Sequence, residues 1–405
     1  MNTCKPTEKQ LAFLDWEFGV FFHFGIRTFY EGHRDWDMQE MPLEGFCPSA
    51  LDCENWISTI AKAGARYAVL VCKHHDGFAN WPSKYTDYSV ANTPWKDGKG
   101  DVVREYVDAC RKYGLKVGLY YSPAEFGSKN QDAKDYDTYF INQISELLTG
   151  YGKIDYLWFD GCGSEGHTYD TERIIGEIRR MQPEILIFNM WDPDTRWVGN
   201  ECGVAGLDNR NVVNSLPFSV LQEEEDALGE DVFLPAECDC TMRMANWFYS
   251  DADEDTVKSV EELMGLYELS VGSGANLLIN IGPDRRGLLP DKDAANLLAF
   301  GEEIRRRYTQ PLGTLDGCTC RFDKPTLVNQ LVLMEDLHEG ESILEFEIWA
   351  QTTKQGTEVL LHKGLAVGHK RICKFPAICA QQLTVKITKA EGTPAHCGGY
   401  AYYVK

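Results

Sequence analysis

Short apolar runs alternate with helical stretches between residues 17 and 307, and this order constrains the fold more than any other feature. In the stretches between the runs, apolar residues recur at three- to four-residue spacing, as on one face of an α-helix. Strand–helix–strand order of this kind indicates parallel strands joined by crossover helices. We expect strands over residues 17–23, 67–71, 115–121, 154–160, 185–189, 232–234 and 276–281, with one more hidden between Asn189 and Val232.

Eight strands in this order favour an α/β fold with a closed, TIM-like (β/α)8 barrel over an open, doubly wound sheet. Beyond residue 312 the pattern changes to a period of two, because Leu344, Phe346 and Ile348 alternate with glutamates. Such alternation is typical of half-buried antiparallel strands. We therefore expect a catalytic (β/α)8 barrel over residues 1–312 and a small antiparallel β-sandwich over residues 313–405.

The charge balance narrows the class of partner. The chain carries 62 acidic and 40 basic residues, for a formal net charge of −22. Nucleic acids and anionic membrane surfaces bind clustered lysines and arginines, so neither is expected as a partner. An uncharged substrate suits this composition better, and the sequence does not indicate an oligomeric state.

We expect a soluble, cytoplasmic protein, because the sequence shows no recognisable targeting signal and its cysteines are scattered. The first ten residues, MNTCKPTEKQ, lack an apolar segment behind a basic one, and no run approaches the roughly 18 apolar residues of a membrane span. The 14 cysteines are scattered and form no C-x-x-C pair. We expect reduced thiols rather than a disulfide framework or a zinc cluster.

Polar residues stand at the ends of most of the expected strands. In a (β/α)8 barrel, residues at the carboxyl ends of the strands meet in one site, whereas those at the other end serve stability. Each residue also has a structural interpretation, since an aspartate can cap a helix and a histidine can bond to backbone in the core. The strand-end residues are His23, His74, His75, Tyr121, Asp160, Asn189, Glu237 and Asn280.

These residue types favour a polyhydroxylated, uncharged ligand. Histidine and tyrosine side chains exchange hydrogen bonds with hydroxyl groups, and the rings of Trp36, Trp158 and Phe24 can stack on a sugar. A metal hydrolase also uses histidine and aspartate at strand ends. The first strand has no H-x-H pair, however, and no second histidine pair follows, so we expect neither a metal nor a cofactor.

Glycoside cleavage requires two carboxyl groups, one ionised and one protonated. Asp160 is the candidate nucleophile, and Glu201 and Glu237 are both candidates for the acid/base. Either glutamate could instead be a solvated loop carboxylate. The competing interpretation from another class is a non-catalytic barrel that binds sugar.

Several long motifs resemble those of the retaining α-L-fucosidases, glycoside hydrolase family 29. The resemblance covers the chain from about residue 17 onward, and the fold of that family agrees with the one expected above. The motifs are FGVFFHFG at 18–25, AGARYAVLVCKHHDGF at 63–78, GLYYSP at 118–123, LWFDG at 157–161 and NLLINIGPDRRG at 276–287.

The resemblance implies roles for individual residues. Asp160 is the implied nucleophile, and a fucosylated oligosaccharide or glycan is the implied substrate. Glu237 stays the alternative acid/base and a candidate substrate contact. The implied fucose-binding residues are His23, Trp36, His74, His75, Tyr121 and Trp158.

The segment RWVGNECG at 196–203 is similar to the segment that holds the acid/base in the branch cleaving α-1,3 and α-1,4 fucose from Lewis-type structures. This similarity favours Glu201 over Glu237 and makes the insertion after Asn189 the leaving-group loop. Met242, Arg243 and Trp247 resemble family positions near the same side. Broader linkage specificity, or transfer of fucose instead of hydrolysis, stays open as an alternative.

Overall fold

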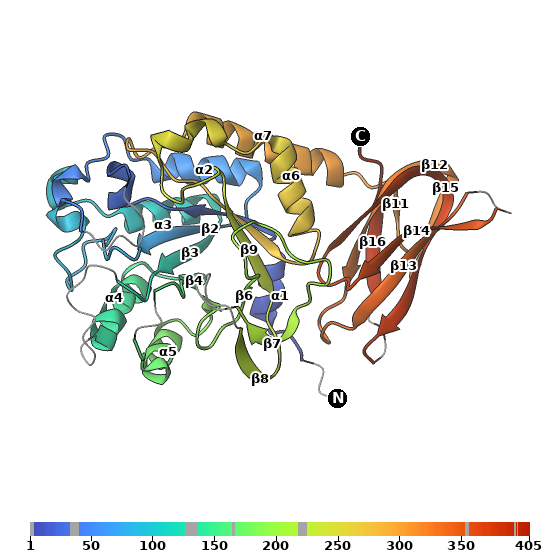
Figure 1. The fold of residues 1–405 in the computed structure, drawn as a ribbon, viewed down its shortest axis with the longest axis horizontal. Helices are drawn as coiled ribbons and strands as arrows, with labels where there is room; N and C mark the ends of the chain where they lie inside the picture. The colour runs from blue at the N-terminus through green and yellow to red at the C-terminus, as the bar shows by residue number, and fades with distance from the viewer. Residues whose placement is uncertain are drawn as a thin grey trace.

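The computed structural model describes residues 4–32, 40–125, 136–163, 167–217, 225–352, 356–392, 394 and 396–405. These residues form a barrel surrounded by helices and, on the side of the C-terminus, an antiparallel sheet (Figure 1).

The barrel sheet has eight strands in the order β5-β4-β3-β2-β1-β10-β9-β6, and its neighbours pair in parallel. A parallel bridge between Phe188 of β5 and Thr195, the residue before β6, nearly closes the sheet. The predicted barrel is therefore confirmed. The strands are β1 (Phe18–Phe22), β2 (Tyr67–Lys73), β3 (Lys116–Tyr121), β4 (Tyr156–Phe159), β5 (Leu186–Phe188), β6 (Arg196–Trp197), β9 (Ala236–Thr241) and β10 (Asn276–Asn280).

One predicted strand belongs to a different element. Residues 232–234 lie at the end of a two-stranded hairpin formed by β7 (Val212–Leu216) and β8 (Asp226–Phe233). The barrel strand is the next one, β9. The two-residue β6 is the strand that was expected to be hidden after Asn189.

Seven α-helices lie in the described part of the chain. Aspartates open three of them, because Asp52, Asp101 and Asp170 each accept a hydrogen bond from a backbone N–H in the first turn. The helices are α1 (Glu8–Leu14), α2 (Cys53–Ala63), α3 (Val102–Tyr113), α4 (Tyr136–Gly150), α5 (Thr171–Met181), α6 (Val260–Leu269) and α7 (Asp291–Tyr308).

Alternation along the barrel strands divides their side chains between two cores. One set packs outward against the helices, as Leu119 and Tyr121 do in β3. The other set fills the barrel interior with large aromatic rings, among them Phe21, Tyr120 and Trp158. Because successive residues of a strand face opposite sides, this division decides which residues can reach a ligand at the mouth.

The C-terminal sheet is antiparallel, in the order β11-β16-β12-β15-β13-β14, and encloses a core of its own. Irregularities in the pairing of β12 with β15 bend these two long strands. The predicted fold class is confirmed, while the domain limits at 312 and 313 stay a prediction. The strands are β11 (Gly313–Thr314), β12 (Thr319–Glu335), β13 (Ile343–Gln351), β14 (Glu358–Leu365), β15 (Arg371–Ala390) and β16 (Cys397–Tyr402).

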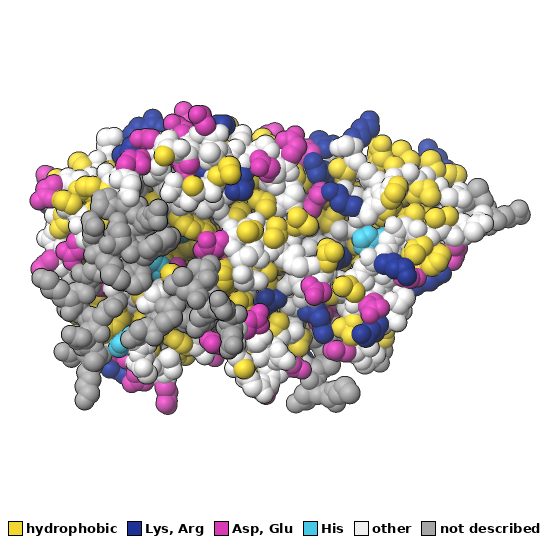
Figure 2. Space-filling view, in the orientation of Figure 1, with side chains coloured by type: hydrophobic (Ala, Val, Ile, Leu, Met, Phe, Trp, Pro, Cys, Tyr) yellow, Lys and Arg dark blue, Asp and Glu magenta, His cyan; other side chains and the backbone are white. Residues whose placement is uncertain are grey.

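On the face shown in Figure 2, acidic and basic side chains are interspersed, and hydrophobic side chains gather over the C-terminal sheet. All 14 cysteines are free thiols. Among the described helices, none combines the length and the hydrophobicity needed to cross a lipid bilayer.

The contact between α2 and α7 predicts a large difference between two helical glycines. A methyl group on Gly301 of α7 would overlap the backbone carbonyl of Ala63, whereas one on Gly265 of α6 would meet open space. We expect Gly301→Ala to lower the free energy of unfolding by about 1–3 kcal/mol through overpacking. Gly265→Ala should raise it by up to about 1 kcal/mol, because alanine favours helix.

Urea unfolding of the two variants measures both effects. Equal stability of the two alanine variants would contradict the close approach of α7 to the end of α2.

Candidate active site

A cavity of about 550 Å³ opens at the carboxyl ends of the barrel strands. Eight of the residues predicted from the sequence line it. The structure therefore brings together residues that are up to 224 positions apart in the chain, from His23 to Trp247. The eight are His23, His74, His75, Trp158, Asp160, Asn189, Glu201 and Trp247.

Groups from three neighbouring strands surround the carboxylate of Asp160. Tyr120 Oη donates to Oδ2 over 2.8 Å, the Cys162 backbone N–H donates to Oδ1 over 2.9 Å, and His75 Nε2 lies 3.5 Å from Oδ2. Burial alone would raise the pKa of Asp160, but the charge of His75 and these hydrogen bonds lower it below its usual value. Asp160 is thus held as an ionised carboxylate that faces the cavity.

His75 is the positive partner in this contact. Ser122 Oγ donates to the carbonyl of Ala124 over 2.7 Å, so it accepts a hydrogen bond from His75 Nδ1, at 2.6 Å. Burial opposes a charge on this ring, yet the charge of Asp160 and hydrogen bonds to Asp160 and Cys162 raise the pKa of His75 to about 10. Both ring nitrogens therefore carry a proton at neutral pH.

His23 is neutral and has a fixed tautomer. Asn280 Nδ2 donates to the carbonyl of Trp247 over 2.7 Å, which leaves Oδ1 to accept from His23 Nδ1, also at 2.7 Å. Burial lowers the pKa of His23 to about 3. The Nε2 atom is then a hydrogen-bond acceptor, suited to a ligand hydroxyl.

His74 is a second neutral ring in the same wall. Its ring stacks on Tyr120 with centroids 5.4 Å apart and planes 9° apart. Burial, reinforced by the neighbouring His75 and His23, lowers the pKa of His74 well below its usual value. Its buried Nδ1 has no hydrogen-bond partner among the described residues, and a polar ligand could supply one.

The tyrosine that faces the cavity is Tyr120, and the prediction that named Tyr121 is wrong by one residue. Tyr121 points outward from the barrel, where its hydroxyl donates to Gln143 of α4 over 2.6 Å. Lys73 Nζ lies 4.1 Å from the centre of its ring. Tyr121 is therefore part of the contact between the barrel and α4.

Glu237 also lies outside the cavity, so neither predicted role for it fits the structure. It is the second residue of β9, deep in the barrel, and is completely buried. Tyr67 Oη donates to it over 2.6 Å and Trp158 Nε1 over 2.9 Å. Burial raises the pKa of Glu237 to about 7, against the effect of these hydrogen bonds. Glu237 thus supports Trp158, which forms part of the cavity wall.

Asp239, two residues further along β9, faces the cavity and was missed by the sequence analysis. Trp197 Nε1 donates to its Oδ1 over 2.7 Å, and both residues line the cavity. Burial and the nearby charge of Glu201 raise the pKa of Asp239 well above its usual value. The sequence does contain a signal for Asp239: it stands two residues after Glu237, so both side chains lie on the same face of the strand.

Glu201 lies in a tight turn beside Asp239. Gly199 and Gly203 have positive φ angles of 95° and 73°, which other residues rarely adopt. Between them, Asn200 Oδ1 accepts a hydrogen bond from the backbone N–H of Cys202 over 3.0 Å. This turn carries the exposed Glu201 side chain to the cavity.

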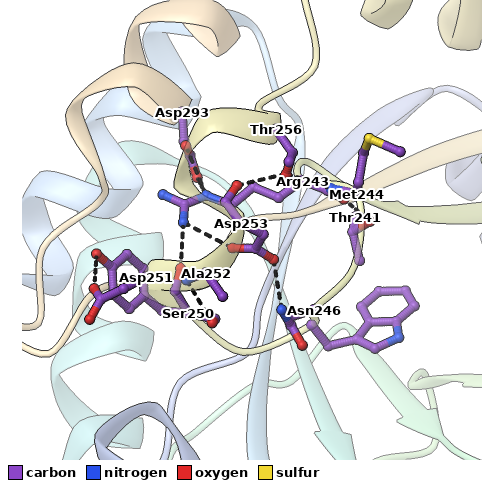
Figure 3. A network of polar contacts seen from close by, with 12 residues as sticks. Thr241, Arg243, Met244, Asn246, Ser250, Asp251, Ala252, Asp253, Thr256 and Asp293 are labelled. Atoms are coloured by element: carbon purple, nitrogen blue, oxygen red, sulfur yellow. Dashed lines mark hydrogen bonds and ion pairs between the residues drawn. The ribbon is translucent and has the colours of Figure 1, made fainter. Parts of the chain in front are cut away.

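The loop after β9, residues 242–256, forms a further wall, and a buried ion network fixes it (Figure 3). Arg243 Nε donates to Asp293 at the start of α7 over 2.9 Å, and its Nη1 donates to Asp253 over 3.3 Å. Arg243 therefore holds the loop from behind. Trp247 of the same loop lines the cavity.

Three other expected contacts have different outcomes. Trp36 lies outside the described residues. Phe24 packs in the outer core, with its ring centre 5.5 Å from that of Trp56, and does not line the cavity. Met242 is likewise a core residue.

Side-chain atoms of His74, His75 and Asp160 lie within 4.8 Å of one another, close enough to surround a metal ion. A histidine ligand must offer a lone pair. In this structure Ser122 accepts from His75 Nδ1, and His75 Nε2 faces Asp160. This arrangement is that of a histidinium–carboxylate pair, and the expectation that the site holds no metal stays a prediction.

Comparison with known proteins identifies the family. The family model described as alpha-L-fucosidase matches residues 2–307 of this chain. The chain belongs to the alpha-L-fucosidase family.

Individual members agree over most of the chain. A relative from Oryza sativa subsp. japonica is 32% identical, covering 96% of this chain and 83% of its own. The Arabidopsis thaliana alpha-L-fucosidase 1 is 28% identical, covering 96% of this chain and 85% of its own. The crystal structure of a glycoside hydrolase 29 family member from an unknown rumen bacterium superposes with a TM-score of 0.90, at 32% identity, covering 100% of this chain and 78% of that one.

The geometry around Asp160 predicts different effects for substitution of the two adjacent tyrosines, because only Tyr120 donates to Asp160. Tyr120→Phe removes a hydrogen bond that helps to lower the pKa of Asp160, so the acid limb of kcat/KM should move to higher pH. We expect kcat on an aryl α-L-fucoside to fall by about tenfold, as for loss of a hydrogen bond to a charged group.

Tyr121→Phe is the matched control, since it changes only the contact with α4. Its pH profile should overlay that of the wild type. A shift of the acid limb in Tyr121→Phe, without one in Tyr120→Phe, would overturn the assignment.

Proposed function

We propose that this protein is an exo-acting α-L-fucosidase that hydrolyses terminal α-linked fucose with retention, through a covalent fucosyl-enzyme. The observation that carries the proposal is the ionised carboxylate of Asp160, which shares one cavity with the second carboxyl group of Glu201. A retaining glycosidase needs such a pair.

In the first step, Asp160 attacks the anomeric carbon and the bond from that carbon to the leaving oxygen breaks. Glu201 gives its proton to the leaving oxygen, so the departing sugar leaves as a neutral alcohol. In the second step, Glu201 takes a proton from water, and the water oxygen displaces Asp160 from the anomeric carbon. Fucose is released with its original configuration, and both carboxyl groups return to their starting states.

We propose that His23, His74, His75, Tyr120 and Trp158 form the fucose-binding wall. The neutral His23 offers an acceptor and the charged His75 offers donors, so the two rings suit hydroxyl groups of opposite orientation. Trp158 adds an aromatic surface that Glu237 holds in place. The role of Trp36 stays a prediction from the family resemblance.

We also propose a preference for α-1,3 and α-1,4 linkages on branched, Lewis-type structures. The support is the segment RWVGNECG, together with its place at the cavity, where Trp197 and Glu201 both lie. Broad linkage specificity and fucosyl transfer are the alternatives. A non-catalytic sugar-binding role is less favoured, because two carboxyl groups in contrasting environments, here Asp160 and Glu201, are typical of acid/base catalysis. The free thiols support a proposed cytoplasmic location.

Azide rescue tests the two carboxyl roles. Asp160→Asn should abolish turnover of an aryl fucoside, since the amide cannot act as the nucleophile. Glu201→Ala should lose activity by about 10²–10⁴-fold on substrates with poor leaving groups. Azide should restore turnover of the aryl fucoside by Glu201→Ala and yield a fucosyl azide.

The matched variants are Asp239→Ala and Glu237→Ala, which change the two acidic residues of β9. Rescue by azide of either one, with none for Glu201→Ala, would overturn the assignment of Glu201. NMR of the first-formed fucose anomer reports retention directly.

Product analysis tests the linkage preference. Lewis-type trisaccharides carry a branching galactose that 2′-fucosyllactose lacks. We expect kcat/KM to be at least about 100-fold higher for the trisaccharides, a difference that a few new polar contacts can supply. Comparable rates on the two substrates would instead favour broad linkage specificity.

A further inference from the structure

Residues 198–211 form a single loop, here called the Glu201 loop, and the barrel holds its first part. The backbone N–H of Val198 donates to the carbonyl of Glu237 over 3.0 Å. Cys202 then forms an antiparallel bridge with Cys240 of β9. The barrel thus fixes the loop just before and just after Glu201.

The C-terminal sheet holds the other end of the loop. Glu341 Oε2 accepts a hydrogen bond from the backbone N–H of Asn211 over 2.6 Å. Arg371 Nη2, from the first residue of β15, approaches the carbonyl oxygen of Asn209 to 3.5 Å. Two residues distant in sequence therefore contact the end of the Glu201 loop.

Arg196 connects the two ends. It belongs to β6, beside Trp197, and its Nη2 donates to Asn209 Oδ1 over 2.6 Å and to the Arg210 carbonyl over 3.0 Å. Asn209 therefore receives contacts from Arg196 and from Arg371. Through these contacts, the C-terminal sheet meets the same short segment that the barrel strand β6 holds.

This junction is poorly suited to stabilising the fold. Arg196 is 7% exposed, Arg371 5% and Glu341 3%, and burial lowers the pKa of both arginines. Arg196 Nε, Arg371 Nη1 and Glu341 Oε1 are buried without a hydrogen-bond partner among the described residues. Buried groups left unsatisfied cost free energy, and apolar side chains of similar volume are often as stabilising. The hydrogen bonds of Arg196 and Glu341 do, however, fix the position of the end of the Glu201 loop.

We propose that Arg371 of β15 and Glu341 of the connection between β12 and β13 are positioning residues for the acid/base Glu201, acting through Asn209 and Asn211. The inference rests on the proposed function of Glu201. By this inference, the C-terminal sheet contributes to protonation of the leaving group, although Arg371 and Glu341 do not line the cavity.

The leaving group distinguishes positioning from general stability. An activated aryl fucoside leaves without much help from an acid, whereas a fucosylated oligosaccharide requires protonation by Glu201. We expect Arg371→Met to lower kcat/KM on the oligosaccharide by roughly 10- to 100-fold, the scale of a small misplacement of a catalytic group. On the aryl fucoside, kcat/KM should change by less than about threefold, because it reports only the first step, in which the activated leaving group needs little acid and the nucleophile is untouched. The comparison uses kcat/KM because kcat also contains the second step, in which Glu201 is the base for both substrates.

Lys374→Met is the matched control. Lys374 also lies on β15 and forms an ion pair across the junction, but with Glu268 of α6 and not with the Glu201 loop. This variant should keep the wild-type ratio of the two rates. Equal losses on both substrates in Arg371→Met, or the same selective loss in Lys374→Met, would overturn the proposal.

A second pair of variants tests the other residue. Glu341→Ala should show the same selective loss on the oligosaccharide. Glu341→Gln should restore at least about a third of the rate, because its amide oxygen still accepts from Asn211 N–H. Failure of the glutamine to restore the rate in a folded protein would contradict positioning through this hydrogen bond.

Hydrogen–deuterium exchange separates this inference from the proposed function. Arg371→Met should increase exchange in residues 198–211 at least about threefold, and Lys374→Met should not. Wild-type protein that cleaves neither substrate would refute the proposed function, while the exchange result would still report on the junction. Unchanged exchange in Arg371→Met would refute the junction itself.

Discussion

The contact of Asp160 with His75 and Tyr120 is the interaction on which the cavity depends. The three residues come from the ends of β4, β2 and β3, and the register pairs Val71 with Tyr120 and Tyr120 with Trp158. Parallel pairing brings the carboxyl ends of these strands to the same edge. A buried carboxylate would otherwise be costly, and the charged His75 together with two hydrogen bonds offsets that cost.

The order of strands and helices, and the ends of the strands, could be predicted from the sequence because each rests on local patterns. Apolar runs and periodic helices carry that information within about ten residues. Such a pattern does not show which of two adjacent residues faces the barrel interior when both are large and aromatic. The motif GLYYSP narrows the choice to Tyr120 and Tyr121, but the pairing of Tyr120 with the inward-facing Trp158 decides it.

Strand β9 shows why part of the site was out of reach. Its sequence, AECDCT, has no apolar run, and its inward residues are Glu237 and Asp239. Their partners come from distant strands, since Tyr67 lies 170 residues from Glu237 and Trp197 lies 42 residues from Asp239. Only the closed barrel brings these donors to the carboxyl groups. In the sequence, the apolar residues 232–234 therefore resembled a buried strand more than the acidic β9 did.

The two carboxyl groups proposed for catalysis differ in how the protein controls them. Asp160 follows a barrel strand, and the positive His75 lowers its pKa. Glu201 stands in an exposed turn beside Asp239, and burial together with the charge of Glu201 raises the pKa of Asp239 well above its usual value. The barrel therefore favours an ionised Asp160 at one side of the cavity and a protonated Asp239 beside Glu201 at the other. Because the second side is built on a loop, its geometry depends on whatever holds both ends of that loop.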